Sequence, residues 1–408
     1  MRRAHLCAVL GFGLMLATAS SEARELALSA DFRVGGDNNI FRTGSNRVAD
    51  GFIEISPRAS VRESRSTLNY DFDYRPTYEA FVDTSGVDGF DHQAGADLTW
   101  RPTPIDTLGF VSNYRNYRTL RFGDESSPLD PVPDLEQSDR LRIQRADARV
   151  FYSRMLTSTF SVQTSLSFDD VDYDRGRNVD SRAFTGGIGM QYAVSPKTTI
   201  GLSGSARRRR NRGLDSLNQF STRTDIVDVA ASIQRSLSPT MDVSIQAGPS
   251  FIRTKQEAPP IFPPGFDSKD RTVSFFAYAD LEKRWRRSTA DLSYTRSESD
   301  SGGTSSSSIV DVVVLKVDHR FDQRWSLHAE ASWNRRKEIV AVGASRRVKF
   351  TQYSASFLVS RKISRQLSVV GHYSYRTQDQ SGSSNFNSIG DLHLGFLSLR
   401  YTFDPIVF

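Results

Sequence analysis

The dominant pattern along the chain is an alternation of apolar and polar side chains with a period of two. In residues 68–75, every second side chain is Leu, Tyr or Phe, and the side chains between them are Asn, Asp or Arg. Only an extended strand sorts such residues onto two opposite faces. The pattern recurs in segments 94–100, 243–251, 273–281, 325–333 and 353–359. The chain is therefore predicted to consist mostly of amphipathic β-strands.

The connections between these strands alternate strictly between short and long. The short turns are expected near residue 63 and at 102–106, 156–158, 195–197, 238–240, 285–288, 322–324 and 363–365. The long connections are expected at 35–50, 77–90, 119–139, 173–181, 208–223, 254–270, 297–308, 336–345 and 377–388, and they hold seven of the 15 prolines, with much Gly, Ser and Asp. This rhythm predicts about 18 strands joined by hairpins.

An open sheet of this size, with no second layer to cover its apolar face, would expose that face and both edges to water. Closure into a barrel within lipid removes both problems. Bacterial outer-membrane barrels have an even number of strands, short periplasmic turns and long extracellular loops. We therefore predict an all-β fold, an antiparallel up-and-down transmembrane barrel with both ends of the barrel domain on the periplasmic side.

Aromatic residues mark where the two membrane surfaces are expected. Amphipathic rings prefer the headgroup boundary. Three tryptophans lie beside short turns and five tyrosines lie near long connections: Trp100, Trp285 and Trp325, and Tyr74, Tyr114, Tyr173, Tyr294 and Tyr375. These residues predict two aromatic girdles. The competing interpretation, a soluble β-sandwich core, does not require alternating turns and loops.

The N-terminus has the pattern of an export signal. Arg2 and Arg3 precede an apolar stretch that reaches Ala17-Thr18-Ala19, a small-residue cleavage pattern. We predict a signal peptide at 1–23, cleaved after Ala19 or Ala23, followed by one barrel domain at 24–408. Cys7, the single cysteine, lies in this signal, so the mature chain offers no disulfide or thiolate.

Three short motifs carry a resemblance to a known family. They are residues 37–42 (DNNIFR), residues 74–78 (YRPTY) before the loop that leads to 90–92 (FDH), and residues 397–403 (LSLRYTF) in the last strand. Together with the hairpin rhythm they resemble the outer-membrane β-barrel porins found with exopolysaccharide biosynthesis and export genes. The resemblance implies a role in moving polysaccharide at the outer membrane of a Gram-negative bacterium.

The C-terminus departs from the usual barrel signal. Such barrels end on an aromatic residue of the last strand, and here Tyr401 and Phe403 are followed by five further residues. Pro405 cannot donate a hydrogen bond to a strand neighbour. We expect the strand to end before Pro405, with Phe403 as the lipid-facing signal and Phe408 in an appended tail.

Arginine is the most suggestive residue type for the channel interior. Only eight of the 53 basic residues are lysine, and the formal charge of +6 is too small to indicate nucleic-acid binding. Guanidinium groups hold their charge in a confined channel and bind carboxylate or phosphate in bidentate fashion. Seven arginines fall on the expected lumenal register and are candidate contacts for an anionic polysaccharide: Arg75, Arg115, Arg145, Arg149, Arg207, Arg376 and Arg400.

The same register also holds acids, so cross-strand pairing is the simpler interpretation of many of these arginines. The acids are Asp71, Asp73, Asp97, Asp147, Asp169, Asp228 and Glu330. Phe276 and Tyr278 are candidate sugar-stacking residues in the lumen. The run Arg207–Arg210 with Arg212 is expected to enter an extracellular loop, where it could bind an acidic polymer or lipopolysaccharide phosphate, or be solvated.

No catalytic, metal or cofactor site is predicted. The five histidines of the mature chain, His92, His319, His328, His372 and His393, show no metal-ligand spacing. The leading hypothesis is a conduit for exopolysaccharide export, ahead of a general or selective diffusion porin and a polysaccharide-modifying enzyme. The expected partners are outer-membrane lipid, lipopolysaccharide, the barrel-assembly machinery, exopolysaccharide and periplasmic export components, but not nucleic acid.

Overall fold

The computed structural model describes residues 24–41, 47–118, 142–174, 179–213, 221–257, 268–300, 307–338, 349–381 and 391–407. The predicted signal peptide lies outside them. The strands are β1 (Glu25–Asp37), β2 (Asp50–Ser64), β3 (Leu68–Phe81), β4 (Gly89–Thr103), β5 (Asp106–Arg118), β6 (Arg142–Met155), β7 (Phe160–Tyr173), β8 (Val179–Ser195), β9 (Thr198–Gly213), β10 (Ser221–Ser238), β11 (Met241–Glu257), β12 (Ser268–Arg284), β13 (Ser288–Asp300), β14 (Ser307–Arg320), β15 (Trp325–Glu338), β16 (Lys349–Lys362), β17 (Leu367–Ser381), β18 (Leu392–Thr402) and the short β19 (Ile406–Val407).

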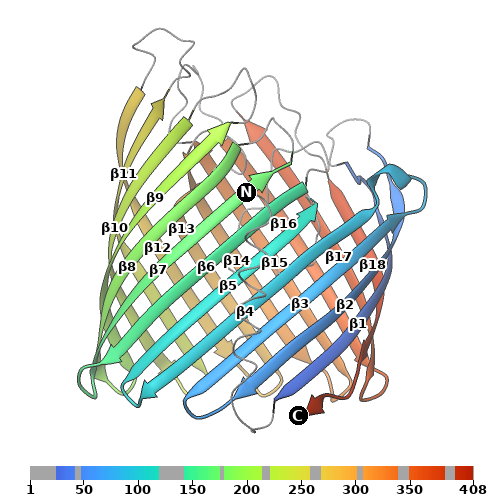
Figure 1. Ribbon diagram of the computed structural model, residues 1–408, viewed down its shortest axis with the longest axis horizontal. Helices are drawn as coiled ribbons and strands as arrows, with labels where there is room; N and C mark the ends of the chain where they lie inside the picture. Colours follow the sequence, from blue (N-terminus) through green and yellow to red (C-terminus); the bar gives the residue numbers. More distant parts are fainter. Residues whose placement is uncertain are drawn as a thin grey trace.

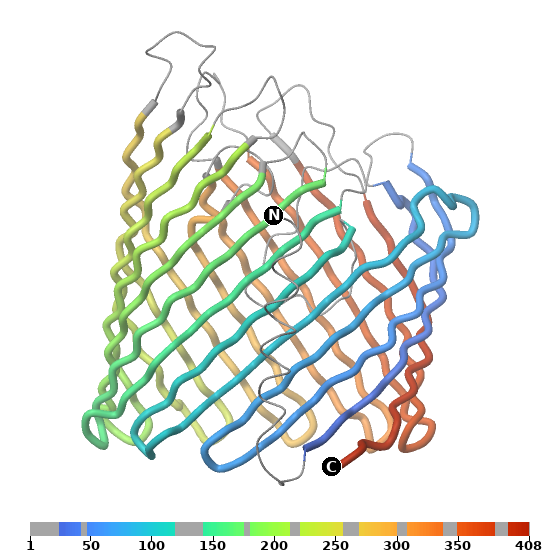
Figure 2. The backbone as a smooth tube through the Cα atoms, in the orientation of Figure 1, coloured from blue at the N-terminus to red at the C-terminus, as the bar shows by residue number. Residues whose placement is uncertain are grey.

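Each strand from β2 to β17 pairs antiparallel with the strands before and after it, and β1 pairs with both β2 and β18. The sheet is therefore closed into a single barrel (Figures 1 and 2). The prediction of about 18 strands, joined by eight short turns and nine longer connections, is confirmed. A single short 3₁₀ helix, Ser85–Val87, interrupts the connection between β3 and β4 in the part of the chain that is described.

Alternation along each strand separates an outer from an inner face. On β1, for example, Phe32 and Val34 are exposed, whereas Asp31 and Arg33, which alternate with them, are buried. The same division holds along much of the barrel, where large apolar side chains lie outside and charged side chains lie inside. Among the residues that are described, no helix is long and apolar enough to cross a membrane.

The barrel wall is uneven in height. Strands β8–β12 have 17, 16, 18, 17 and 17 residues, whereas β13–β16 have 13, 14, 14 and 14. We call β8–β12 the tall panel; its β11 and β12 rise above the rest of the wall (Figure 1). The expected loops 208–223 and 254–270 are correspondingly shorter, because β9 continues to Gly213 and β11 to Glu257. The arginine run thus lies within β9 and not in a loop, which corrects that expectation.

The seam between β1 and β18 closes the barrel. Arg400 Nε donates to Asp31 Oδ1 at 2.7 Å across it, on the inner face. At the extracellular end, the backbone N–H of Asn38 donates to the carbonyl of His393 at 3.1 Å, and the N–H of His393 donates to Asn38 Oδ1 at 2.8 Å. Backbone pairing and side-chain contacts therefore both fasten the seam.

The C-terminal residues continue this seam beyond Pro405. β18 ends at Thr402, as expected for a strand that stops before proline, and the N–H of Phe403 donates to the carbonyl of Leu28 at 2.9 Å. Ile406 and Val407 then pair with the start of β1 as β19. The interruption at Pro405 is therefore local, and Ile406 and Val407 of the appended segment rejoin the sheet; Phe408 lies outside the described residues.

The aromatic girdles match the prediction with one exception. Trp100, Trp285 and Trp325 are exposed near the short turns. Tyr173, which we expected in the extracellular girdle, is on the inner face of β7 and packs with Ile143 and Val171. A tyrosine near the end of a strand can lie on either face of the sheet. The register places Tyr173 on the same face as Val171, which is the inner face.

Candidate lumenal site

All seven predicted arginines lie on the inner face. In each strand the exposed apolar side chains mark the outer face, and the cross-strand register places these arginines on the other face. They are Arg75, Arg115, Arg145, Arg149, Arg207, Arg376 and Arg400. The seven acids that share the expected register lie on this face as well, as do Phe276 and Tyr278. The interior is therefore lined by charges of both signs.

Three of the arginines form a basic row across four strands. Arg75 on β3 is opposite Gln93 on β4, Gln93 is opposite Arg115 on β5, and Arg115 is opposite Arg145 on β6. Because neighbouring strands lie about 4.8 Å apart, the row extends over roughly 14 Å of wall. Arg149 adds positive charge four residues further along β6, towards the periplasmic end, and its guanidinium lies over the ring of Phe151.

An acidic row lies directly beside the basic row. Asp73, Gly95, Asn113, Asp147 and Asp169 face one another in register across β3–β7. The two rows touch at Arg145, whose Nη2 is 3.6 Å from Asp169 Oδ1. Asn113 Nδ2 donates to Asp147 Oδ2 at 3.0 Å and holds this carboxylate in place. The predicted pairing of arginines with acids is therefore observed for Arg145, and it is also observed between Arg400 and Asp31.

One side of the extracellular mouth is narrowed by the connection between β1 and β2. Asn39 and Ile40 are buried, and the N–H of Asn39 donates to Asp37 Oδ1 at 2.9 Å, which turns the chain inward. Ile40 then packs against inner-face residues of three strands, among them Phe52, Phe81 and Phe396. Residues 37–41 of the DNNIFR motif, which carried part of the family resemblance, therefore build an apolar cluster inside the mouth.

The opposite side of the mouth is crossed by the end of β13. Pairing of β12 with β13 stops at Ala277 and Arg296, although β13 continues to Asp300. Glu298 then meets Arg209 of β9 at 2.7 Å from Oε1 to Nη1, and both side chains are buried. Since β10, β11 and β12 separate these strands in the wall, the end of β13 turns inward across the mouth.

Sequence reasoning missed Glu298, and it placed Arg209 in the arginine run that was expected to enter a loop. It assigned only their neighbour Arg207 to the lumen, and Arg207 Nη1 is 3.9 Å from Glu298 Oε2. It also missed the buried pair of Arg33 and Glu54, 3.1 Å apart on the inner face of β1 and β2. Alternation identified the face of each residue. No local signal identifies a partner across the lumen.

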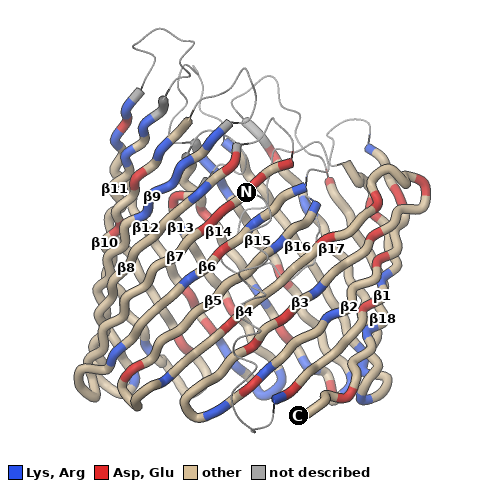
Figure 3. The backbone as a smooth tube through the Cα atoms, viewed as in Figure 1, with Lys and Arg blue, Asp and Glu red and all other residues tan. Residues whose placement is uncertain are grey.

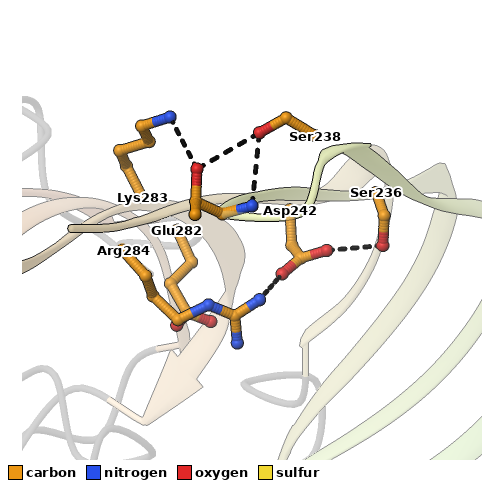
Figure 4. Close-up of polar contacts among 7 residues, drawn as sticks. Ser236, Ser238, Asp242, Glu282, Lys283 and Arg284 are labelled. Atoms are coloured by element: carbon orange, nitrogen blue, oxygen red, sulfur yellow. Dashed lines mark hydrogen bonds and ion pairs between the residues drawn. The ribbon is translucent and has the colours of Figure 1, made fainter. Parts of the chain in front are cut away.

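The periplasmic rim carries a separate polar cluster at the turn between β10 and β11 (Figure 4). Asp242 accepts a hydrogen bond from Ser236 Oγ at 2.6 Å and pairs with Arg284 of β12. Lys283 Nζ donates to Thr240 Oγ1 at 3.0 Å. These contacts tie the turn to β12 and place charged groups at this part of the periplasmic rim.

Four of the five histidines have a ring nitrogen within hydrogen-bond distance of one neighbouring side chain. Tyr74 and Tyr373 contact Nδ1 of His92 and His393 at 2.9 and 2.8 Å. His319 contacts Ser288, and His328 contacts Asp318. Within the described part of the chain, no three His, Cys, Asp or Glu residues are grouped as metal ligands.

The chain matches no protein-family model, and no curated protein matches it significantly. It is similar in fold to the ferric-catecholate import receptor Fiu from E. coli K12, with 8% identity, a TM-score of 0.48 and coverage of 92% of this chain and 81% of that one. It is also similar to OccK2 (OpdF) from Pseudomonas aeruginosa, with 10% identity, a TM-score of 0.44 and coverage of 94% and 98%. The FrpB iron transporter from Neisseria meningitidis (F5-1 variant) has 8% identity, a TM-score of 0.49 and coverage of 95% and 82%. The likeness is one of fold.

Proposed function

We propose that this barrel is a passive conduit for an acidic polysaccharide in the outer membrane of a Gram-negative bacterium, as a component of exopolysaccharide export. The observation that carries the proposal is the basic row of Arg75, Arg115 and Arg145 on the inner face of β3–β6. The motif resemblance to barrels found with exopolysaccharide genes supports the choice of cargo.

The shape of the basic row favours a polymer over a small solute. Its guanidinium groups come from β3, β5 and β6, so they offer carboxylates several docking points about 5 to 10 Å apart. A chain of acidic sugars can engage several points together, whereas a single small anion engages one. The adjacent acidic row limits how tightly such a chain is held, and transport requires binding that is weak enough for release.

A selective diffusion porin is the second candidate. The side-by-side arrangement of the acidic and basic rows supports it, because small polar solutes of either charge would find partners there. The two candidates predict different deletion phenotypes. Loss of a conduit stops polymer release and leaves small-solute uptake unchanged, whereas loss of a porin does the reverse.

Planar-bilayer recordings test the role of the basic row. We expect the purified barrel to prefer anions and the triple variant Arg75→Ser/Arg115→Ser/Arg145→Ser to lose that preference, because the row supplies the local field. The same variant should reduce polymer release while the amount of heat-modifiable barrel in the membrane is unchanged.

A matched control removes three outer-face cations of β15 and β16, Arg335, Lys337 and Lys349, which should alter neither selectivity nor release. Cation preference in the unmodified channel would contradict the role of the basic row. Normal polymer secretion in a deletion strain would contradict the export function.

A further inference from the structure

The outer face of the tall panel carries two rows of charged side chains that face one another in register. The upper row consists of Arg182, Arg210, Arg223, Lys255 and Lys269, and the lower row of Arg208, Asp225, Arg253 and Arg271. Blue segments accordingly gather where these strands reach the extracellular rim (Figure 3). The arginine run in β9 contributes to both rows, since Arg208 and Arg210 point outward whereas Arg207 and Arg209 point inward.

The positive charge of these rows is only partly neutralised within the protein. Asp225 pairs with Arg208 at 2.7 Å and with Arg223 at 3.2 Å, and Asp170 pairs with Arg182 at 2.9 Å. Five other members form no ion pair with a described residue: Arg210, Arg253, Lys255, Lys269 and Arg271. Like charges that are directly opposite on neighbouring strands destabilise a sheet. Binding of an external anion would reduce this repulsion, so the charged rows favour anion binding.

An apolar groove lies immediately below the charged rows. It has a volume of 1160 Å³, and Arg208, Arg253 and Arg271 line its upper border. Small residues, Gly186 and Ala206, lie in register at its middle. Larger side chains rise on both sides, with Leu166 70% and Val273 72% exposed. The groove thus has a low floor between apolar walls, and its upper border holds three arginines and one acid, Asp225.

The backbone of β12 places the rows at the polar boundary of the membrane. Its residues 268–276 extend beyond the pairing with β13, which ends at Ala277. Unpaired backbone groups are costly in hydrocarbon, so the end that carries Lys269 and Arg271 belongs in the hydrated headgroup layer. Val273, at one border of the groove, lies on this same segment of β12. Gly186 and Ala206 lie on strands that are paired on both sides, so the middle of the groove lies at the level of acyl chains.

We infer that the outer face of the tall panel is a binding site for a phosphorylated, multiply acylated glycolipid of the outer leaflet, the lipid A portion of lipopolysaccharide. Its phosphates contact Arg253, Arg271 and their neighbours, and its acyl chains fill the groove over Gly186 and Ala206. Arginine binds phosphate through paired, charge-assisted hydrogen bonds. An acidic polysaccharide fits this face less well, because it has nothing apolar to place in the groove.

The test measures binding of diphosphorylated, hexa-acylated lipid A to the full barrel in nanodiscs, with dephosphorylated lipid A and polygalacturonate as comparison ligands. We expect Arg253→Ser/Arg271→Ser to weaken binding of the diphosphorylated form by at least about tenfold, since each lost charge-assisted bond is strong. The matched control Lys337→Ser/Lys349→Ser removes two facing cations from β15 and β16 and should bind as the unmodified protein does.

A second variant tests the groove without touching any charge. A Cβ at Gly186 meets Leu166 at 3.5 Å, an ordinary contact, so Gly186→Leu can fill the groove while the backbone stays in place. It should weaken lipid A binding severalfold and leave polygalacturonate binding unchanged. Heat-modifiable migration checks folding of every variant, and bilayer conductance should be unaffected because these residues lie outside the lumen.

Three results would overturn the inference: equal binding of lipid A by the Arg253/Arg271 variant, an equal loss in the lysine control, or tighter binding of polygalacturonate than of lipid A. The last would assign the rows to a polymer. None of these results bears on the lumenal basic row, so the proposed conduit would stand or fall separately.

Discussion

The barrel meets the extracellular boundary of the membrane in two different ways. On β16–β18 the outer face carries Tyr353, Tyr373, Tyr375 and His393, which we call the aromatic wall. Three of its four members have polar partners within the protein: Tyr373 contacts His393 at 2.8 Å, and Tyr375 donates to Asp391 at 2.8 Å. On the tall panel the same boundary carries more cationic side chains than there are acidic side chains to pair with them.

The difference shows which parts of the wall depend on their surroundings. An amphipathic ring is suited to any headgroup boundary, so the aromatic wall is complete whatever lipid lies beside it. A row of facing arginines and lysines is destabilised by its own repulsion and relieved by a bound anion. We therefore expect the panel, and not the aromatic wall, to respond to the chemistry of the outer leaflet.

Orientation is the all-or-none test of this comparison, because both regions must face the outside of the cell. Cysteine at Ala49 or Ser85, in exposed connections beside β2 and β3, should react with an impermeant thiol reagent on intact cells. Cysteine at Lys197 or Arg324, in short turns, should not react until the membrane is opened. The reverse labelling pattern would invert the barrel and place the basic rows on the periplasmic side.

Hydrogen exchange should separate the two regions next. Lipid A at about 100 times its dissociation constant stabilises a bound state by about 2.7 kcal/mol, which slows exchange through local opening by roughly a hundredfold. We expect this protection in peptides that cover 206–212 and 251–257, and no change in a peptide that covers 369–377. Equal protection of both regions would remove the distinction between them.

Removal of one hydroxyl tests whether the aromatic wall is self-sufficient. Tyr373→Phe deletes the contact with His393 and should lower the free energy of unfolding by about 0.5–1 kcal/mol, with or without lipid A present. Tyr353→Phe is the control, since no hydrogen bond of its hydroxyl is formed with a described residue. Urea titrations in both lipid environments measure the effect, and a loss seen only with lipid A would argue against self-sufficiency.

The smallest effect is expected from reversing one charge in the upper row. Arg210 lies opposite both Arg182 and Arg223, so Arg210→Glu replaces two repulsive pairs with attractive ones. In a neutral detergent we expect a gain of about 0.5 kcal/mol in the free energy of unfolding. With lipid A bound, the same change should be destabilising. A change of one sign in both conditions would contradict the idea that an external anion neutralises the row.

Strand number, closure and face could be predicted from the sequence because they depend on local properties. Alternation assigns a side to each residue, and connection length assigns an end to each hairpin. This was enough to place Arg75, Arg115 and Arg145 on the inner face. The ends of the strands were predicted less well, because residues 208–213 lack apolar alternation and still pair where the wall rises above the hydrocarbon.

The mouth of the barrel was beyond sequence reasoning for a different reason. Arg209 and Glu298 are 89 positions apart and belong to strands that are not neighbours. Their contact depends on how far β13 turns inward, which is decided by packing across the lumen. Tyr173 was assigned to the wrong face because its ring suits a girdle and an inner cluster equally well.

The seam has a consequence for the order of folding. Every other strand pair joins neighbours along the chain, but Arg400 and Asp31 are 369 positions apart. Hairpins can form one after another by closing short loops, whereas the pairing of β1 with β18 and β19 must wait for the last residues to arrive. Loop-closure entropy rises only with the logarithm of length, so closure is late without being prohibitive. Asp31→Ala should therefore act mainly on the final closing step and leave the earlier hairpins to assemble at their normal rate.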